Sequence, residues 1–394
     1  MHKRVLVVGL GIAGMSAAIG LRQAGWTPVI VERAPERRQG GYFVGLMAEG
    51  RQAAVDLGIA DHLHIRNPPD GGKAWSLTRR GRREPGVGFL HQPGDPAAVL
   101  RGDVEAALWR SACGDGTNEP VDVRFATAPV EIRAVGGEVR VLFEEAGTGA
   151  RYSEGFDLVV GADGLRSSVR RTVFGPDEDY MTNWDAMICA FQLQEQVPSF
   201  DEADSVISAR AGRAVWVFGL ADRPPTVLLT YRTEDTRKQF TGSVVQRLRT
   251  VFAGMDDPAV RHALAALERA PEFLFDSVHQ VRMPRWSSGR VVLLGDAAWC
   301  PNLYSGMGAT LALRGGADLG RALLESPDDL DAALTAWESG LRPFVRRHQR
   351  IARLKQQMFV PSSRPVEALR SVVLRLVCAV RERRSARARA GVPA

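Results

Sequence analysis

The hydrophobic pattern of the first 33 residues predicts a βαβ unit. A Val-rich run from Lys3 to Val8 precedes an Ala-rich stretch that reaches about Gln23, and a second apolar run extends from Thr27 to Val31. Short β-branched runs are typical of buried strands, whereas the longer Ala-rich stretch has the spacing of a helix. We therefore expect two neighbouring parallel strands joined by a helix.

Three glycines stand between the first strand and the helix, in the segment Gly9-Leu-Gly11-Ile-Ala-Gly14. Such a motif is weak alone, but here it follows a strand, opens a helix and precedes Glu32 at the end of the next strand. The glycines would permit a tight turn, approach of the backbone to a pyrophosphate, and close packing of helix and strand. Glu32 would accept hydrogen bonds from ribose hydroxyls. The motif predicts a dinucleotide site, with a turn that serves packing alone as the alternative.

The pattern after Arg33 differs from that of an NAD dehydrogenase, which would continue with further βα units. A Gly-rich loop from Gly40 to Gly45 comes first. Helical stretches are predicted at about 48–57 and 101–109, and strands at 121–125, 130–134 and 139–143 with a turn at 136–137. A β meander behind one dinucleotide-binding half favours a two-domain FAD enzyme.

Two later apolar runs end in an acidic residue. Residues 156–161 lead into Asp163, and residues 290–294 lead into Gly295 and Asp296, with Pro301 and a second glycine pair shortly after. The carboxyl ends of parallel strands are the usual binding edge of such a sheet, and a carboxylate there suits a ribityl hydroxyl chain. Capping of the following helix is the alternative role for both acids.

The composition limits the class of protein but does not indicate a particular reaction. The chain has 394 residues, 45% apolar and 24% charged, which is typical of an ordinary enzyme and excludes a disordered tail or a coiled coil. The four cysteines are scattered, so neither a metal site nor a disulfide framework is expected. No apolar run approaches the roughly 18 residues of a membrane span, and we expect a cytoplasmic protein.

The net charge of +6 comes almost entirely from arginine, since only four of the 51 basic residues are lysine. Nucleic-acid binding would require basic and aromatic residues interleaved in one stripe, and the sequence has none. The nearest candidate is the basic segment 370–389, which is explained as well by a C-terminal helix as by a phosphate-binding arm. We therefore expect no nucleic-acid partner.

The three motifs, in this order, resemble those of the class A flavoprotein monooxygenases, the group of p-hydroxybenzoate hydroxylase and the tetracycline-inactivating monooxygenases. The resemblance covers Val5 to about Ala322. It implies an α/β fold in which a Rossmann-like FAD-binding domain of the GR2 type is interrupted by an α+β substrate domain and followed by C-terminal helices. The implied limits are 1–177 and 285–330 for the FAD-binding domain, 178–284 for the mainly β-sheet substrate domain and 331–394 for the helices.

The resemblance assigns the motif residues to FAD. Arg101 matches an arginine at the phosphate or ribityl region, Asp163 an acid linked to FAD and the nicotinamide nucleotide, and Asp296 the acid at the ribityl chain. The loop facing the pyrimidine side of the flavin is matched by Pro301, Gly306, Met307, Gly308 and Ala309. The positions matched at the pyrophosphate, the ribose and the last strand end are Gly9, Gly11, Gly14, Glu32, Arg33 and Gly295.

The sequence departs from this group at three places. Thr310 stands where many members have Asn, and Arg314-Gly315 where an acidic pair often follows. Gly45 stands where tetracycline-inactivating members can have an acid, which does not support the same substrate.

The implied reaction is hydroxylation or epoxidation of an electron-rich aromatic or polycyclic molecule, in bacterial secondary metabolism, through a C4a-hydroperoxyflavin. FAD is the implied cofactor, NADPH or NADH a transient co-substrate and O2 the oxidant, in a monomer or homodimer without a metal. No side chain is nominated as acid or base. Strands predicted at 186–192, 214–220 and 226–232 carry aromatic residues, and the substrate candidates are Tyr42, Trp216, Phe218, Tyr231 and Tyr304. Trp216 and Phe218, two apart, would share one face of a strand.

Other functions remain open. An FAD-dependent reductase of the geranylgeranyl-reductase type would share the glycine loop and the Gly-Asp motif but reduce a double bond. A flavin halogenase is disfavoured because its Trp-x-Trp-x-Ile signature is absent. A nonenzymatic FAD-binding protein, docking acidic partners through its arginines, is the alternative from a different class.

Overall fold

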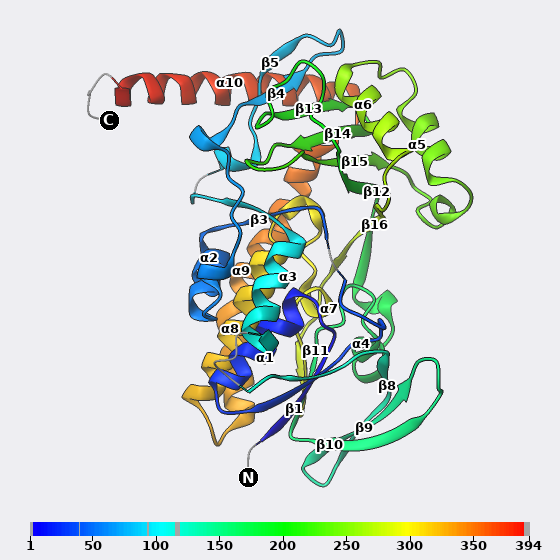
Figure 1. Ribbon diagram of the computed structural model, residues 1–394, viewed down its shortest axis with the longest axis vertical. Coiled ribbons are helices and arrows are strands. Elements are labelled where there is room, and N and C mark those ends of the chain that lie inside the picture. Colours follow the sequence, from blue (N-terminus) through cyan, green and yellow to red (C-terminus); the bar gives the residue numbers. More distant parts are fainter. Residues whose placement is uncertain (1–2, 39, 93, 115–118, 390–394) are drawn as a thin grey trace.

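Five parallel strands form the centre of the lower lobe in Figure 1 and carry all three motifs. A computed structural model describes residues 3–38, 40–92, 94–114 and 119–389. The six-stranded sheet has the order β17 (Ser287–Ser288), β18 (Val291–Leu293), β11 (Leu158–Gly161), β1 (Arg4–Val8), β2 (Thr27–Val31) and β7 (Asp122–Arg124), with only β17 antiparallel.

The register of this sheet brings the motifs to one edge. Val8 lies opposite Gly161, and Gly161 lies opposite Leu293, so three strands end at the same level. The glycine turn, the loop of Asp163 and the loop of Asp296 leave from these three ends. The predicted convergence of the motifs at the carboxyl edge is therefore confirmed.

Helices α1 (Ile12–Gln23) and α8 (Gly308–Glu325) pack closely against each other on one face of this sheet (Figure 1). The Ser16 hydroxyl donates to the carbonyl oxygen of Ala312 at 2.9 Å. One turn further on, a Cβ on Gly20 would lie 2.6 Å from the carbonyl oxygen of Gly316. Both pairs have the same offset along the chain, so the helices run parallel and in step.

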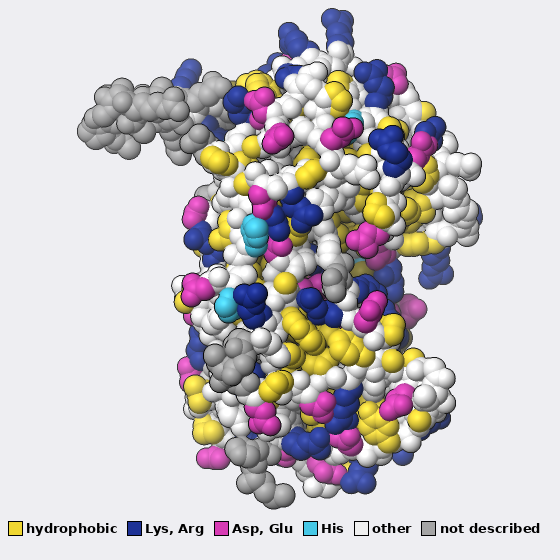
Figure 2. All heavy atoms as spheres, in the orientation of Figure 1, with side chains coloured by type: hydrophobic (Ala, Val, Ile, Leu, Met, Phe, Trp, Pro, Cys, Tyr) yellow, Lys and Arg dark blue, Asp and Glu magenta, His cyan; other side chains and the backbone are white. Residues whose placement is uncertain are grey.

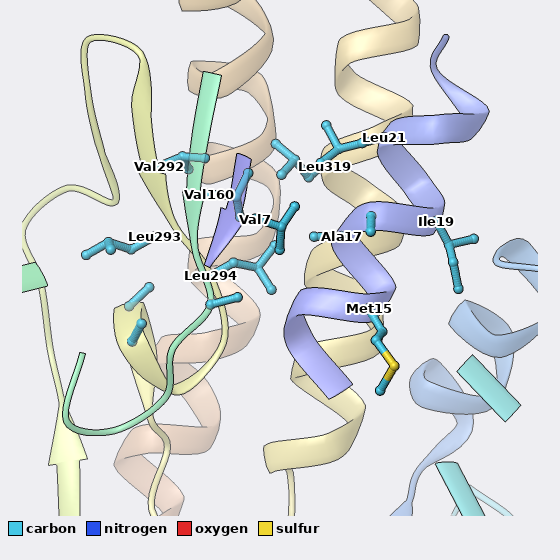
Figure 3. Close-up of a cluster of buried hydrophobic side chains, with 14 of the residues drawn as sticks. Val7, Met15, Ala17, Ile19, Leu21, Val160, Val292, Leu293, Leu294 and Leu319 are labelled. Atoms are coloured by element: carbon cyan, nitrogen blue, oxygen red, sulfur yellow. The ribbon is translucent and has the colours of Figure 1, made fainter. Parts of the chain in front are cut away.

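This parallel packing sets the N-terminal ends of α1 and α8 side by side. The backbones touch through glycine, because a Cβ on Gly320 would lie 2.2 Å from the carbonyl oxygen of Gly20. Figure 3 shows Leu21 of α1 beside Leu319 of α8, with Val7 and Val160 on the strand side of α1. The opposite face of the sheet is covered by the antiparallel meander of β8 (Thr127–Val135), β9 (Glu138–Glu145) and β10 (Arg151–Phe156).

The upper lobe is a seven-stranded sheet that draws on two separate parts of the chain. Its face away from the lower lobe is covered by α5 (Val244–Phe252) and α6 (Pro258–Leu267). Its strands, in order, are β16 (Leu274–Val281), β12 (Met181–Gln192), β15 (Thr226–Arg232), β14 (Arg213–Phe218), β13 (Ser205–Arg210), β4 (Ala74–Leu77) and β5 (Arg83–Pro85).

The two-stranded ribbon of β3 (Phe43–Leu46) and β6 (Ala97–Leu100) lies between the lobes, and α9 (Leu330–Phe359) links them as a 30-residue spine. Near its start the Trp337 indole donates to the carbonyl oxygen of Gly315, and at its end Phe359 stacks on Trp216 of β14 at 4.2 Å. The remaining α-helices of the described residues are α2 (Ala48–Asp56), α3 (Arg101–Trp109), α4 (Ser168–Val173), α7 (Asp296–Trp299) and α10 (Arg364–Arg389).

The α/β class, the βαβ unit, the helix at 101–109 and the helical C-terminal region are confirmed. One feature differs from the expected domain limits. Strands β4 and β5 lie within residues 1–177 but join the upper sheet, where β4 pairs in parallel with β13. The segment 178–284 contains strands β12 to β16 together with α5 and α6, as expected of an α+β domain that is mainly β-sheet.

The glycine contact between α1 and α8 predicts that Gly320→Ala destabilises the protein. A Cβ placed 2.2 Å from a backbone carbonyl forces the helices apart, and we expect the free energy of unfolding to fall by about 1–3 kcal/mol. The matched control is Gly340→Ala in α9, where a Cβ meets nothing within 4 Å and should stabilise by about 0.5–1 kcal/mol. Urea unfolding of both variants measures this; similar stabilisation by both would contradict the close contact.

Candidate active site

The glycine motif forms a tight turn in which each glycine has a different environment. Gly9 has φ +105°, and a Cβ there would lie 2.6 Å from the carbonyl oxygen of Ala162. A Cβ on Gly14 would lie 1.9 Å from the carbonyl oxygen of Gly9, so both positions require glycine for packing. Gly11 faces open space, because the nearest atom to a Cβ there is Nη2 of Arg101 at 4.0 Å. Only Gly11 thus leaves room for a ligand.

Glu32 holds this turn to the end of β2. Its carboxylate accepts hydrogen bonds from the backbone N–H groups of Leu10 at 3.0 Å and Ala34 at 2.9 Å. Two oxygens offer about four acceptor positions, so capacity remains for a further donor. Arg33 is exposed beside it. Binding of the ADP ribose by these two residues stays a prediction.

Arg101, the first residue of α3, reaches toward the open side of Gly11 and pairs with Glu105 at 2.8 Å. Burial disfavours its charge, but Glu105 and neighbouring groups outweigh this cost and raise the pKa of Arg101. Its backbone N–H also donates to the carbonyl oxygen of Tyr42 at 3.0 Å. Burial raises the pKa of the Tyr42 phenol, although Arg101 opposes the shift, so Tyr42 keeps its proton at neutral pH. Glu105 was not among the residues predicted from the sequence.

Asp296 is the first residue of α7. Its side chain is accessible to solvent, yet protein surrounds it so closely that desolvation raises the pKa of its carboxyl group. The Cys300 thiol and the Arg101 guanidinium oppose this shift in part. The preceding residue, Gly295, has φ +67° and lies against Ala13 of α1, where a Cβ would be 2.7 Å from that of Ala13. Asp296, Arg101 and Tyr42 therefore act on one another electrostatically across the end of α1.

Asp163 directs its carboxylate at the start of α4, the helix that follows it in the chain. It accepts hydrogen bonds from the hydroxyls of Ser167 and Ser168 and from the backbone N–H groups of Ser168 and Val169, at the start of α4. The capping role that the sequence left open is therefore present. A contact with FAD or a nicotinamide nucleotide stays a prediction for this residue.

The loop between α7 and α8 is held from several sides. Gln280 donates to the carbonyl oxygen of Pro301 at 3.2 Å, and Lys355 donates to that of Ser305 at 2.8 Å. Asn302 is buried with φ +78°; its Oδ1 accepts from the backbone of Tyr304, whereas its Nδ2 has no partner among the described residues. A buried amide N–H without an acceptor is costly, so it marks a place for a ligand. Sequence reasoning did not identify Asn302.

The same loop ends at the N-terminus of α8, which carries no side-chain cap. Gly306 and Gly308 are exposed, and a Cβ on either would meet nothing within 4 Å. Met307 is buried at the cap position, and Ala309 is partly exposed in the first turn. Thr310, one of the departures noted above, accepts from the backbone N–H of Met47 at 3.0 Å and joins α8 to α2. The N-terminus of α1 is also uncapped, so two sets of free N–H groups lie together.

A row of aromatic rings lies above this region on the lower face of the upper sheet. Phe218 stacks on Phe43 with ring centroids 4.3 Å apart, and Trp216 lies 6.3 Å from Phe218, so the two predicted residues do share one face. Phe359 and then Tyr304 continue the row. Phe43 and Phe359 were missed, because their pairing joins segments that are distant in sequence.

Tyr304 and Tyr231 occupy different positions from the other substrate candidates. Tyr304 is fully buried, its hydroxyl is 2.8 Å from that of Thr230, and burial raises its pKa to about 12. Tyr231 lies on the opposite face of the sheet, in the core under α5 and α6, and donates to Gln239 at 2.9 Å. The structure therefore brings Tyr42, Trp216, Phe218 and Tyr304 to one side of the sheet and leaves Tyr231 on the other.

The departure at Gly45 has a structural counterpart. A Cβ on Gly45 would lie 2.0 Å from the ring of Phe89, which packs edge-on against Phe43. An acidic side chain at position 45 has no room while Phe89 lies there. In this chain, the ring of Phe89 occupies the space that an acidic side chain at position 45 would need.

The arrangement fits FAD. The open side of Gly11 and the free N–H groups of α1 suit a pyrophosphate, Asp296 suits the ribityl hydroxyls, and the end of α8 suits the electron-rich edge of a flavin. The orphaned amide of Asn302 adds a donor at the same loop.

This is the architecture of the two-domain FAD-dependent monooxygenases, a class of oxidoreductases. Residues 2–342 match the sequence model of the family described as FAD binding domain, and the chain belongs to this family. The resemblance to the class A flavoprotein monooxygenases is thereby confirmed.

Individual relatives agree with this assignment. The chain is 26% identical to a flavin-dependent monooxygenase of an unknown prokaryotic organism over 361 residues, 88% of this chain and 87% of the relative. Among solved structures it is similar to tetracycline destructase Tet(51), with a TM-score of 0.74, 26% identity, and coverage of 95% and 96% of the two chains. Klebsiella pneumoniae HpxO, solved with FAD and uric acid, has the same fold, with a TM-score of 0.75, 21% identity, and coverage of 95% and 93%.

The open environment of Gly11 predicts that Gly11→Ala separates FAD binding from stability. Without FAD the added Cβ has room and Gly11 has φ −80°, so the free energy of unfolding should change by less than about 0.5 kcal/mol. The same Cβ blocks the approach of a pyrophosphate, and we expect FAD affinity to fall at least about tenfold. Titration of flavin fluorescence measures the affinity, with Gly340→Ala as control. Undiminished FAD binding would contradict the placement of the pyrophosphate.

The raised pKa of Asp296 predicts a pH-dependent cost in the FAD-free protein. A carboxyl whose folded pKa is raised contributes stability below its unfolded pKa and loses that contribution as pH rises through the folded value. The melting temperature of the wild type should therefore decline relative to Asp296→Asn as pH rises above 3.8 toward neutrality. In the same variant FAD should bind about 10–100-fold more weakly, because hydrogen bonds to a charged acceptor are lost. Parallel melting curves for the two proteins would exclude the cost.

Proposed function

We propose that this monooxygenase takes reducing equivalents from NADPH or NADH and inserts one atom of O2 into an electron-rich aromatic or polycyclic small molecule. The observation that carries this proposal is the row of aromatic rings that packs with Tyr42, which in turn acts electrostatically on Asp296. Stacked Phe and Trp rings make this side of the sheet apolar and aromatic, which suits a planar substrate and excludes water. Hydroxylation and epoxidation are the two outcomes that such a substrate allows.

When bound, FAD would supply the hydride acceptor and the activation of O2, which no protein side chain provides. The chain's own part is to bind and orient. The N–H groups at the start of α1 would hold the pyrophosphate near Gly11, Asp296 would accept from the ribityl chain, and the start of α8 would stabilise negative charge at the flavin edge.

Tyr42 is the side chain best placed to hold a proton near the substrate. Its raised pKa keeps the phenolic hydroxyl protonated at neutral pH, and it acts electrostatically on both Arg101 and Asp296. We propose that this hydroxyl donates a hydrogen bond to an oxygen of the substrate. Trp216 and Phe218 would fix the plane of the substrate, and the buried Tyr304 would hold the α8 loop against the upper sheet.

The similar structures support a planar substrate. HpxO was solved with uric acid, a flat heterocycle, and Tet(51) is a tetracycline destructase. The ring of Phe89 beside Gly45 makes this part of the present chain apolar, which favours a substrate with an uncharged ring at that point.

The test is to mix the FAD-loaded protein with NADPH or NADH and a panel of phenolic and polycyclic compounds. A substrate should accelerate flavin reduction, O2 should be consumed, and mass spectrometry under labelled O2 should find one labelled oxygen atom in the product. A product with two added hydrogens and no O2 consumption would instead identify a reductase. Absence of flavin reduction with every compound would favour a nonenzymatic FAD-binding protein.

Phe218→Ala tests the row of aromatic rings once a substrate is found. Loss of a stacked ring should raise the KM for the substrate roughly tenfold, since aromatic pairs and buried apolar area contribute about 1–2 kcal/mol. The matched control is Phe275→Ala, a partly buried Phe on the other face of the same sheet, which should leave KM unchanged. Equal effects of the two variants on KM would indicate a general loss of packing and contradict the proposed role of the row.

A further inference from the structure

Helix α10 exposes a continuous apolar stripe. It lies across the edge of the upper sheet and then runs outward from the molecule (Figure 1). The side chains of Leu369 and Leu376 are 63% and 62% exposed. With them, at helical spacings of three and four, lie the exposed residues Val372, Val373, Val377 and Val380. The opposite face, with Glu367, Leu374 and Cys378, is the buried one.

The same helix carries the net charge of the protein. Its sequence holds eight arginines and two glutamates, a formal charge of +6, which equals the net charge of the whole chain. The rest of the chain is therefore balanced, and Figure 2 shows Lys and Arg mixed with Asp and Glu over the face it displays. An apolar stripe on an arginine-rich helix fits a surface that is both apolar and negatively charged.

A basic cavity of about 590 Å³ adjoins the stripe, between α10 and strands β4, β5 and β13. Val372 belongs to both the stripe and the cavity lining. Five arginines line the cavity against two glutamates: Arg79, Arg210, Arg364, Arg370 and Arg375 against Glu84 and Glu367.

Arg370 is the buried cation of this cavity. It is only 5% exposed, and its Nε donates to the carbonyl oxygen of Met358 at 2.6 Å. Desolvation lowers its pKa to about 10, because Glu367 compensates only in part. Glu367 is itself engaged by Arg79 at 2.8 Å and by the backbone N–H of Ala211. The cavity thus has room and positive charge for an anionic group.

We propose that α10 docks the protein on a membrane surface rich in anionic phospholipid, with the apolar stripe among the acyl chains and a headgroup phosphate in the arginine-lined cavity. Among the described residues, no helix is long and apolar enough to cross a bilayer, so the contact is peripheral. A second copy of the chain is the less favourable occupant, because pairing two such helices would bring two charges of +6 together.

The experiment uses the FAD-loaded protein and sedimentation with vesicles. We expect binding to phosphatidylcholine vesicles that contain phosphatidylglycerol, little binding to pure phosphatidylcholine, and weaker binding as sodium chloride rises. The variant Leu369→Ser/Leu376→Ser should bind at least about tenfold more weakly. Its matched control is Leu324→Ser/Leu354→Ser, two equally exposed leucines on α8 and α9.

A second pair of variants tests the charge. Arg375→Gln/Arg383→Gln should also weaken binding about tenfold, whereas Arg133→Gln/Arg140→Gln removes the same charge from the exposed β8–β9 hairpin and should bind like the wild type. Unchanged FAD content would show that each variant is folded.

Three results would overturn the proposal. These are equal binding to neutral and anionic vesicles, no binding to either, and equal effects of the test and control variants. Light scattering in solution distinguishes the other occupant: a dimer that becomes a monomer in Leu369→Ser/Leu376→Ser, without vesicle binding, would make the stripe an interface between copies. None of these results bears on the monooxygenase reaction, which is measured without vesicles.

Discussion

The close contact between α1 and α8 is the constraint on which the site depends. Because Gly20, Gly316 and Gly320 have no side chains, the two backbones touch and the helices stay parallel and in step. Their N-terminal ends then fall side by side at the carboxyl edge of the sheet. Wider packing would move apart the N-terminal ends of α1 and α8, which we propose to hold the pyrophosphate and the flavin edge.

This geometry also has an electrostatic cost. Two aligned helices place two partial positive charges together, and Arg101 adds a full charge near the same point. Glu105 and Asp296 neutralise part of this positive charge, but desolvation raises the pKa of both carboxyl groups. This concentration of positive charge suits a ligand that carries a pyrophosphate.

Local patterns predicted most of the lower lobe. The strand-turn-helix of residues 4–23, helix α3 and the β8–β9 hairpin follow from periodicity and glycines within short segments. The expected meander was wrong in part, because residues 122–124 form β7 of the parallel sheet and β10 supplies the third strand of the meander. Non-local pairings could not be predicted in the same way. Strand β4 joins β13 about 130 residues later, and no local signal marks that pairing. The paired glycines on α8, four residues apart, were a signal that sequence reasoning did not use.

The aromatic residues illustrate the same limit. Alternation within β14 correctly placed Trp216 and Phe218 on one face, but it says nothing of the next strand. In the register, Leu228 lies opposite Trp216, so Tyr231, three residues further on, points to the far side. Phe43, Phe89 and Phe359 were missed because each reaches the row of aromatic rings from a different segment. In the candidate site, the sequence therefore predicted where the glycine and Gly-Asp motifs lie in the sheet. It did not predict which residues complete the row of aromatic rings.

The split of the lower lobe also has a consequence for synthesis. The glycine turn and α1 are made before α8, the packing partner of α1, which begins about 300 residues later in the chain. Until then, one side of α1 lacks the helix that covers it. The two helix N-terminal ends that we propose for FAD binding are not yet side by side. We therefore expect FAD to bind only after α8 has been made.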